Sequence, residues 1–122
     1  EQASSGIYLN EEVGTLPPQW RLNYFTRIDN QKSIIVDRLR NEVIYRKLNL
    51  MERNFPFRKL FHVIFCRNVM IYFDTQTKRQ LVQKFYNSLE PGGYLFVGHS
   101  ESLNPEETSF KYVIPAVYRK EQ

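Results

Sequence analysis

The sequence is poor in the residues that disulfide-rich and metal-binding proteins depend on. Its 122 residues include one cysteine, which excludes an internal disulfide and a multi-cysteine metal site. The two histidines, His62 and His99, are not placed to form a metal site. No apolar run approaches the roughly 18 residues of a transmembrane helix, and residues 1–20 lack the pattern of a signal peptide. We therefore expect a cytoplasmic protein with no metal and no direct insertion into a membrane.

Glycine is also scarce, and its placement excludes two common nucleotide-binding motifs. The five glycines are Gly6, Gly14, Gly92, Gly93 and Gly98. They form neither the GxGxxG pattern of dinucleotide-binding folds nor a P-loop, both of which use glycine to bring backbone amides close to phosphate. A nucleotide-type cofactor would therefore need a glycine loop from outside these residues.

The composition is that of a globular protein with one basic stretch. Apolar residues make up 42% of the chain and charged residues 25%, which favours one folded domain. Lysine and arginine number 17 against 13 acidic residues, and residues 31–60 hold eight basic and three acidic side chains. This stretch either attracts an acidic partner or forms an ordinary solvated face. It contains no RNA-binding motif and no zinc-finger spacing, so we expect no nucleic-acid partner.

The first part of the chain predicts a small antiparallel β-subdomain. Pro18 suits the first turn of a helix, whereas residues 20–28 and 33–39 predict two strands joined by a polar turn. Residues 41–50 alternate as a strand does and predict a further strand. We assign the antiparallel β-subdomain to residues 22–46.

The second part predicts a parallel crossover. Residues 60–66 are almost wholly apolar, as in a strand buried on both faces of a parallel sheet. Asp74 or Thr75 caps a helix with one apolar stripe, and Glu90-Pro91-Gly92-Gly93 ends it. A second buried strand follows at 94–99, and two short strands around Pro115 close the chain. The fold class is therefore α/β with an antiparallel end.

Two segments follow the predicted parallel strands, at the edge where open α/β sheets bind ligands. They are residues 66–73 and 98–102. Arg67 and Asn68 directly follow an apolar strand, which is an unusual place for a cation and an amide. A guanidinium there either grips a substrate carboxylate through two hydrogen bonds or pairs with a structural acid, and position alone leaves both open.

The remaining reactive side chains have structural explanations. Gly98-His99-Ser100-Glu101-Ser102 misses the nucleophile-elbow pattern of hydrolases at its last position, so we interpret it as a capped turn. Adjacent His and Ser also do not easily form the hydrogen bond of a triad. His62 is predicted to be a core residue. Cys66 has no basic partner evident in the sequence and is predicted to be a buried thiol.

Two motifs in combination are specific to one family. The segments FHVIFCRNVMIYFD (61–74) and LVQKFYNSLEPGGYLFVGHSESL (81–103) resemble the CheR-type chemotaxis receptor methyltransferases. The resemblance extends back through GIY (6–8), LPPQWRLNYF (16–25) and VIYRKLNL (43–50), so it covers nearly the whole chain. These enzymes use S-adenosyl-L-methionine to methylate glutamates on the cytoplasmic signalling helices of chemotaxis receptors.

The resemblance implies a fold and a set of site residues. The fold is part of a class I S-adenosylmethionine-dependent methyltransferase (Rossmann-like) sheet with a small antiparallel β-subdomain. Asn49 and Leu50 match family positions at the adenine of the cofactor. Arg67 and Asn68 match positions that also line the cofactor site, and Arg67 would in addition face the substrate carboxylate. Tyr72 matches a tyrosine near the transferring methyl group.

The implied function is that of a protein-glutamate O-methyltransferase, with S-adenosyl-L-homocysteine as the second product. Residues 1–122 resemble the carboxyl-terminal part of its catalytic domain, and we expect this chain to be inactive alone. We also expect it to pair with a second copy, because the strand at 62–66 would lack the neighbours it has in a whole domain. Two alternatives remain open: a truncated non-enzymatic module that binds receptors or other proteins, and a related methyltransferase for a small acid.

Overall fold

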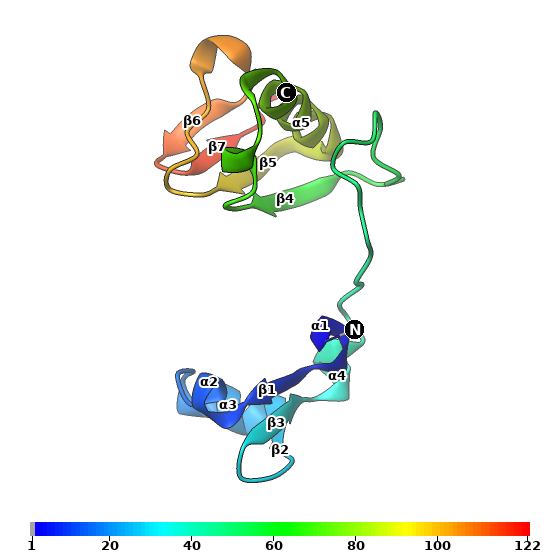
Figure 1. Cartoon of the computed structure of the whole chain (residues 1–122), viewed down its shortest axis with the longest axis vertical. Helices are drawn as coiled ribbons and strands as arrows, with labels where there is room; N and C mark the ends of the chain where they lie inside the picture. The colour runs from blue at the N-terminus through cyan, green and yellow to red at the C-terminus, as the bar shows by residue number, and fades with distance from the viewer. Residues whose placement is uncertain (1) are drawn as a thin grey trace. The chain divides into compact units, whose positions relative to one another are not determined.

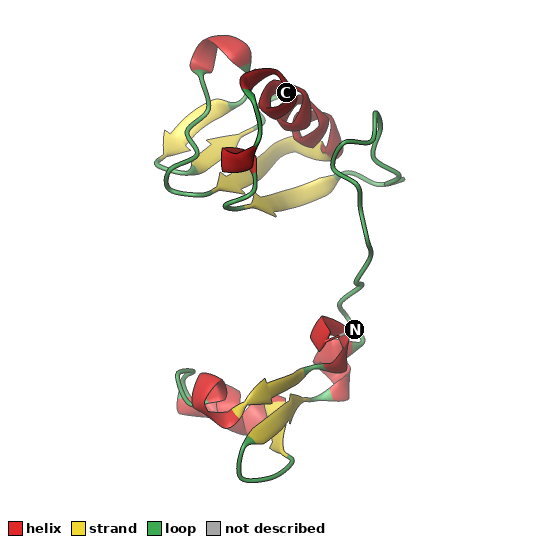
Figure 2. Cartoon of the chain, in the orientation of Figure 1, coloured by secondary structure: helices red, strands yellow, loops and turns green. Residues whose placement is uncertain are grey.

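The computed structural model describes residues 2–122, and its helices and strands confirm the predicted α/β class (Figure 1, Figure 2). The chain divides into an amino-terminal unit, Glu1–Leu48, and a carboxyl-terminal unit, Asn49–Gln122. Among residues 2–122, no helix combines the length and the apolar character needed to cross a bilayer.

The amino-terminal unit is built on a three-stranded antiparallel sheet with the strand order β1-β3-β2. The hairpin β2–β3 turns at Asp29, whose Oδ1 accepts hydrogen bonds from the backbone N–H groups of Gln31 (2.7 Å) and Lys32 (2.8 Å). These bonds replace ladder bonds at the tip and fix the register of the hairpin. The elements are α1 (Gln2–Ser5), β1 (Ile7–Leu9), α2 (Asn10–Val13), α3 (Pro18–Tyr24), β2 (Phe25–Arg27), β3 (Lys32–Ile35) and α4 (Asp37–Arg40).

Three sequence predictions for this unit need correction. The predicted strand at 33–39 is wrong in its second half, because β3 ends at Ile35 and Asp37–Arg40 forms the helix α4. The predicted strand at 20–28 is helical as far as Tyr24, because Pro18 fixes the first helical turn, and only Phe25–Arg27 joins the sheet. The predicted strand at 41–50 is wrong: those residues form no helix or strand, and Val43, Ile44 and Tyr45 are all exposed. A sequence of alternating apolar and polar residues forms a strand only where a neighbouring strand supplies backbone hydrogen bonds.

The carboxyl-terminal unit is a four-stranded sheet, with the strand order β4-β5-β7-β6, and a helix α5 (Figure 1). β4 runs parallel to β5, and β7 runs antiparallel to both β5 and β6. The predicted strand–helix–strand crossover is therefore confirmed, although β5 begins earlier and ends at Val97. The elements are β4 (Phe61–Cys66), η1 (Met70–Tyr72), α5 (Thr75–Ser88), β5 (Leu89–Val97), η2 (Pro105–Glu107), β6 (Lys111–Ile114) and β7 (Val117–Arg119).

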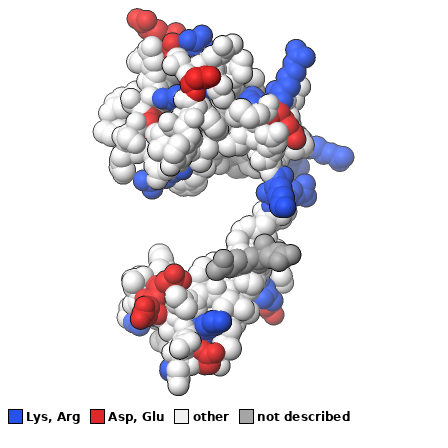
Figure 3. All heavy atoms as spheres, viewed as in Figure 1, with Lys and Arg blue, Asp and Glu red and all other residues white. Residues whose placement is uncertain are grey.

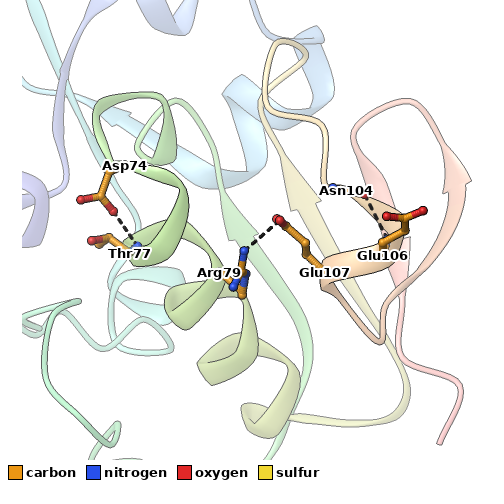
Figure 4. Close-up of polar contacts among 6 residues, drawn as sticks. All are labelled: Asp74, Thr77, Arg79, Asn104, Glu106 and Glu107. Atoms are coloured by element: carbon orange, nitrogen blue, oxygen red, sulfur yellow. Dashed lines mark hydrogen bonds and ion pairs between the residues drawn. The ribbon is translucent and has the colours of Figure 1, made fainter.

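Local side-chain contacts fix both ends of α5. Asp74 is the N-cap, as predicted, and its Oδ1 accepts a hydrogen bond from the backbone N–H of Thr77 at 2.7 Å (Figure 4). At the other end the Lys120 ammonium donates to the carbonyls of Tyr86 and Leu89, each at 2.9 Å. A cation there also complements the negative end of the helix dipole.

The core of the carboxyl-terminal unit lies between α5 and one face of the sheet. The predicted apolar stripe of the helix is buried there, with Leu81, Val82 and Phe85 at 0%, 5% and 5% exposure. They pack with Met70, which anchors η1, and with Leu89, Leu95 and Val97 of β5. Cys66 is confirmed as a buried thiol, and burial together with the nearby Glu101 carboxylate raises its pKa to about 11.

The prediction that β4 is buried on both faces is wrong. β4 is an edge strand with one neighbour, and Phe61, Val63 and Phe65 are 38%, 42% and 69% exposed. An apolar sequence predicts that a strand prefers burial, but burial also needs an element on each face, and within residues 2–122 helix α5 covers one face only. His62 lies on this strand and is exposed, so its assignment to the core is wrong as well.

Leu81→Ala should weaken the carboxyl-terminal unit. The leucine is fully buried, so its truncation removes apolar contacts and leaves a cavity, at a cost of about 2–5 kcal/mol in the free energy of unfolding. Urea unfolding followed by far-ultraviolet circular dichroism measures this. The matched control is Gln80→Ala, an exposed neighbour on the same helix, which should change the free energy of unfolding by less than about 0.5 kcal/mol. Equal midpoints for the two variants would contradict the assigned core.

Candidate functional site

The parallel pairing of β4 and β5 brings two distant segments to one edge of the sheet. Cys66, the last residue of β4, lies opposite Val97, the last residue of β5. Both strands therefore end at the same level, and Arg67 and Gly98 begin the two turns that follow. The two segments predicted from the sequence, 66–73 and 98–102, are adjacent in the structure.

A buried carboxylate joins these two turns. Glu101 is 1% exposed, and its Oε1 accepts hydrogen bonds from the backbone N–H of Gly98 (2.8 Å) and of Asn68 (2.5 Å). Its Oε2 accepts from the backbone N–H of Ile71 at 3.1 Å. The first donor belongs to the turn after β5, and the other two belong to the turn after β4. One side chain thus satisfies one buried and two part-buried backbone N–H groups.

The hydrogen bonds decide the charge state of Glu101. Burial by itself raises the pKa of this carboxyl group, because it disfavours the charged form. The backbone N–H groups around the carboxylate outweigh that cost and lower the pKa below its ordinary value of 4.5; they belong to Asn68, Gly98, Met70 and Ile71. Glu101 is therefore an anion at neutral pH, held by backbone dipoles rather than by a cation.

The backbone around the carboxylate leaves little room. A Cβ atom at Gly98 would lie 2.5 Å from Glu101 Oε1 and 2.5 Å from Asn68 Oδ1, so any larger residue here would displace these side chains. Asn68 has a φ of 62°, in the left-handed region that asparagine tolerates better than most residues. The sequence Arg67-Asn68 with a downstream Gly98-x-x-Glu101 therefore encodes one local geometry.

The predicted residues Arg67, Asn68 and Tyr72 all lie in this turn and are exposed, Tyr72 to 80%. Among the described residues, Arg67 takes part in none of the salt bridges. This observation disfavours the interpretation of Arg67 as the partner of a structural acid. A guanidinium, an amide and an aromatic ring are thus available to a ligand at the carboxyl edge of the sheet.

Asn49 and Leu50 lie elsewhere in the carboxyl-terminal unit. The Lys84 ammonium donates hydrogen bonds to the carbonyls of Leu50 and, at 2.8 Å, Glu52. Lys84 is nine residues into α5, and α5 starts at the carboxyl edge, so at 1.5 Å per residue it lies roughly 13 Å further along the helix axis. Asn49 accepts a hydrogen bond from Met51 N–H within its own turn. The structure does not bring this pair together with Arg67 and Asn68.

Sequence reasoning missed Glu101, the residue that organises this edge. Its segment, residues 98–102, was compared with the nucleophile elbow of hydrolases because of His99 and Ser100, which are both exposed. A usable signal was present: an acidic residue one short turn after an apolar strand can be buried only if a cation or several hydrogen-bond donors surround it, and the ends of strands supply backbone N–H donors. Those donors come from 33 and 30 positions earlier in the chain, so their identity could not be inferred locally.

One ion pair and one hydrogen bond hold the segment after Glu101 against α5. Arg79 Nη2 lies 2.8 Å from Glu107 Oε1, and Asn104 Oδ1 accepts from the backbone N–H of Glu106 at 3.0 Å to cap η2 (Figure 4). The Lys78 ammonium donates to the carbonyl of Ser102 at 2.9 Å. A cavity of about 260 Å³ remains between this segment and the helix. These contacts fix the far end of the turn that contains Glu101.

Charged side chains are spread over the surface, and the basic stretch stays solvated. Figure 3 shows lysine and arginine side chains projecting from the surface. All eight basic residues of 31–60 are exposed except Arg40, which is half-buried and pairs with Asp37 at 2.5 Å. Within residues 2–122, no group of three or more histidine, cysteine or acidic side chains is placed to hold a metal ion.

Comparison with known proteins identifies relatives of nearly the whole chain. Residues 1–118 match the family described as CheR methyltransferase, SAM binding domain. The chemotaxis protein methyltransferases of Borreliella burgdorferi and Escherichia coli are each 40% identical to the chain, covering 98% and 97% of it and 42% of each relative. A probable chemotaxis protein methyltransferase of Rhizobium etli is 35% identical, covering 97% of the chain and 48% of the relative. The chain thus spans less than half the length of these relatives.

These matches confirm the resemblance predicted from the two motifs. The family description names S-adenosylmethionine, which is the cofactor predicted from the sequence. The β4–α5–β5 crossover agrees with the predicted class I methyltransferase fold.

The Glu101 carboxylate should make the stability of this chain dependent on pH. Because its pKa is lower in the folded state, it stabilises the fold above the unfolded value of about 4.5, and this contribution is lost as the pH falls through the folded value. In urea unfolding, Glu101→Gln should cost about 1–3 kcal/mol at neutral pH, since its amide opposes backbone donors. The difference from the unmodified chain should shrink below pH 4.5. Glu106→Gln, at an exposed position, is the control. If the difference in free energy of unfolding between Glu101→Gln and the unmodified chain did not change with pH, the lowered pKa would be contradicted.

Proposed function

The chain belongs to the CheR methyltransferase family, and from this premise we propose that it is part of a cytoplasmic protein-glutamate O-methyltransferase. The enzyme would transfer the methyl group of S-adenosyl-L-methionine to glutamate side chains on the signalling helices of chemotaxis receptors. The observation that carries the proposal is the exposure of Arg67, Asn68 and Tyr72 together at the carboxyl edge of the β4–β5 pair. In open α/β sheets this edge is where ligands bind.

The residues at this edge fit the proposed cofactor. The guanidinium of Arg67 is free of salt bridges among the described residues and suits a carboxylate. The Asn68 amide both donates and accepts hydrogen bonds, and the exposed ring of Tyr72 suits a sulfonium cation. Bound S-adenosylmethionine supplies an activated methyl group. Asn49 and Leu50 remain proposed adenine contacts on the family resemblance, and to reach this edge they would have to leave their position beside Lys84.

The proposed chemistry needs positioning more than acid–base catalysis. The ordinary pKa of a glutamate side chain lies well below neutral pH, so its carboxylate is already ionised and needs no general base. The protein must hold this nucleophile in line with the methyl group and compensate its charge. Arg67 is proposed to hold the carboxylate, and Tyr72 to contact the sulfonium end.

Two alternatives differ from this proposal in measurable ways. A non-enzymatic binding module of the same fold is favoured by one observation: Asn49 and Leu50 lie away from Arg67 and Asn68. Titration calorimetry of the natural polypeptide with S-adenosylhomocysteine separates the two, because only the enzyme must bind the cofactor. A methyltransferase for a small acid would bind the cofactor but would not label receptor membranes.

Arg67→Ala should reduce methyl transfer by the natural polypeptide that contains this chain. Loss of the charge-assisted hydrogen bonds to the carboxylate should raise the activation free energy that kcat/KM reports by about 2–4 kcal/mol, by analogy with lost oxyanion donors. Transfer of a radiolabelled methyl group to receptor membranes measures this, with Arg58→Ala, another exposed arginine, as the control. Tyr72→Phe should reduce the rate less than Tyr72→Ala if the ring is the functional part. A near-normal rate for Arg67→Ala would remove Arg67 from the mechanism.

We also propose that these 122 residues, expressed alone, are inactive and self-associate through β4. This edge is six residues long, contains no charged side chain of Lys, Arg, Asp or Glu, and exposes Val63 and Phe65. The other edge, β6, is shorter, carries Lys111 and is followed by Pro115, both of which discourage pairing. Antiparallel pairing of two β4 strands across a two-fold axis would satisfy the open edge and cover apolar surface.

Light scattering should then give a mass near twice 14.7 kDa for this chain. Phe65→Lys should shift the mass toward that of one copy, because it places a charge on the pairing strand. Tyr112→Lys, at an exposed position of β6, should leave the larger mass unchanged. A monomer for the unmodified chain, or an equal effect of the two lysines, would overturn pairing through β4.

A further inference from the structure

We propose that Glu101 is a positioning residue for methyl transfer, which sets the backbone of the turn that presents Arg67, Asn68 and Tyr72. The inference rests on the function proposed above for those three residues. Glu101 itself is 1% exposed, so it acts through the turn and does not touch a ligand. Its oxygens connect this turn to the end of β5.

The turn is fixed through its backbone and its one buried side chain. The backbone N–H groups of Asn68 and Ile71 are bonded to Glu101, and the Met70 side chain, 1% exposed, is packed in the core. The side chains of Arg67 and Tyr72 remain exposed. Such a division is what a binding turn needs: the backbone is fixed by interactions that the ligand does not use, while the ligand-facing groups stay available.

A carboxylate suits this position better than a neutral side chain. Backbone donors converge on both oxygens, and an ionised carboxylate has acceptors only, so every contact is favourable. Glutamine has the same shape, but it would place N–H₂ donors against N–H donors at one of the two positions. Substitution by glutamine therefore leaves either the N–H of Ile71 or the N–H groups of Gly98 and Asn68 without their acceptor, while the volume of the side chain hardly changes.

The left-handed backbone of Asn68 depends on the same contact. A φ of 62° is unfavourable for a residue with a Cβ, and such a conformation persists only where the surroundings hold it. The Asn68 N–H bond to Glu101 is one such restraint, and the close approach of Gly98 is another. Loss of the carboxylate should allow this residue to relax, and with it the direction of the neighbouring Arg67.

Amide hydrogen exchange on this 122-residue chain tests the geometry without any assay of activity. Glu101→Gln should accelerate exchange by roughly tenfold or more at the N–H of either Asn68 or Ile71, whichever faces the new amide nitrogen, because that N–H loses its acceptor. The N–H of Val97, which donates to the Ala116 carbonyl at 2.9 Å, should keep its rate and serves as an internal control. Unchanged exchange at both Asn68 and Ile71 would overturn the proposal.

A double-mutant cycle in the natural polypeptide tests the functional part. Glu101→Gln should lower kcat/KM by roughly 10- to 100-fold, as a small misplacement of reacting groups does. In the Arg67→Ala background the same change should have a much smaller effect, because the group that it positions is already gone. Val82→Ala, a core change in α5, is the matched destabilising control and should leave kcat unchanged at a temperature where the variant is folded.

Additive effects of Glu101→Gln and Arg67→Ala would show that Glu101 only stabilises the fold, and would overturn the proposal. If the proposed function fails instead, the unmodified polypeptide will transfer no methyl group, while the exchange result still stands. Should Glu101→Gln not fold, Gly98→Ala provides a second route, since its methyl group displaces the carboxylate but keeps the charge. It should reproduce the exchange pattern, whereas Ser100→Ala, exposed in the same turn, should not. Exchange like that of the unmodified chain in folded Gly98→Ala would overturn the proposal.

Discussion

Among the described residues, the buried carboxylate of Glu101 takes part in none of the salt bridges, and its hydrogen bonds fix the turn that carries the exposed side chains of Arg67, Asn68 and Tyr72. Burial of a carboxylate is unfavourable unless hydrogen bonds replace its lost water. Glu101 meets that condition by accepting backbone N–H groups from two turns that are far apart in sequence. The need to satisfy one charge therefore imposes the glycine at 98 and holds the left-handed asparagine at 68.

The two units differ in how they are held together. The carboxyl-terminal unit has a contiguous apolar core between α5 and the sheet, in which Leu81, Leu89 and Leu95 are fully buried. The amino-terminal unit buries Val13 and little other apolar surface, and depends on polar contacts such as the Ser33 hydroxyl donating to Asn10 Oδ1 at 2.5 Å. The candidate site lies on the unit with the packed core, and packed, rigid elements hold ligand-binding groups more precisely than loops do.

Local signals predicted the elements whose causes are local. The helix α5 was predictable because Asp74 caps it and its apolar stripe has helical spacing, and the crossover followed from the apolar strands on either side. Predictions failed where a neighbour decides the outcome. Residues 41–50 have the alternating pattern of a strand but pair with no other strand. β4 is apolar but lies at the edge of its sheet. Arg67 and Asn68 were predicted from their position directly after an apolar strand, and the family resemblance gave them roles. Glu101 needed the fold, because two of its backbone donors, Asn68 and Ile71, lie 33 and 30 positions earlier in the chain.

The order of strands in the carboxyl-terminal sheet has a kinetic consequence. Only the β6–β7 pairing joins strands that one tight turn connects; β4 pairs with β5 across helix α5, and β5 pairs with β7 across η2 and β6. Closing a short loop costs less entropy than joining distant strands, so the β6–β7 hairpin should form before the parallel β4–β5 pairing. The Glu101 contact, by contrast, can form only after β4 and β5 have met in register. Pairing of β4 with β5 should therefore precede the ordering of the turn at residues 67–73, and local opening of that turn need not disturb the sheet.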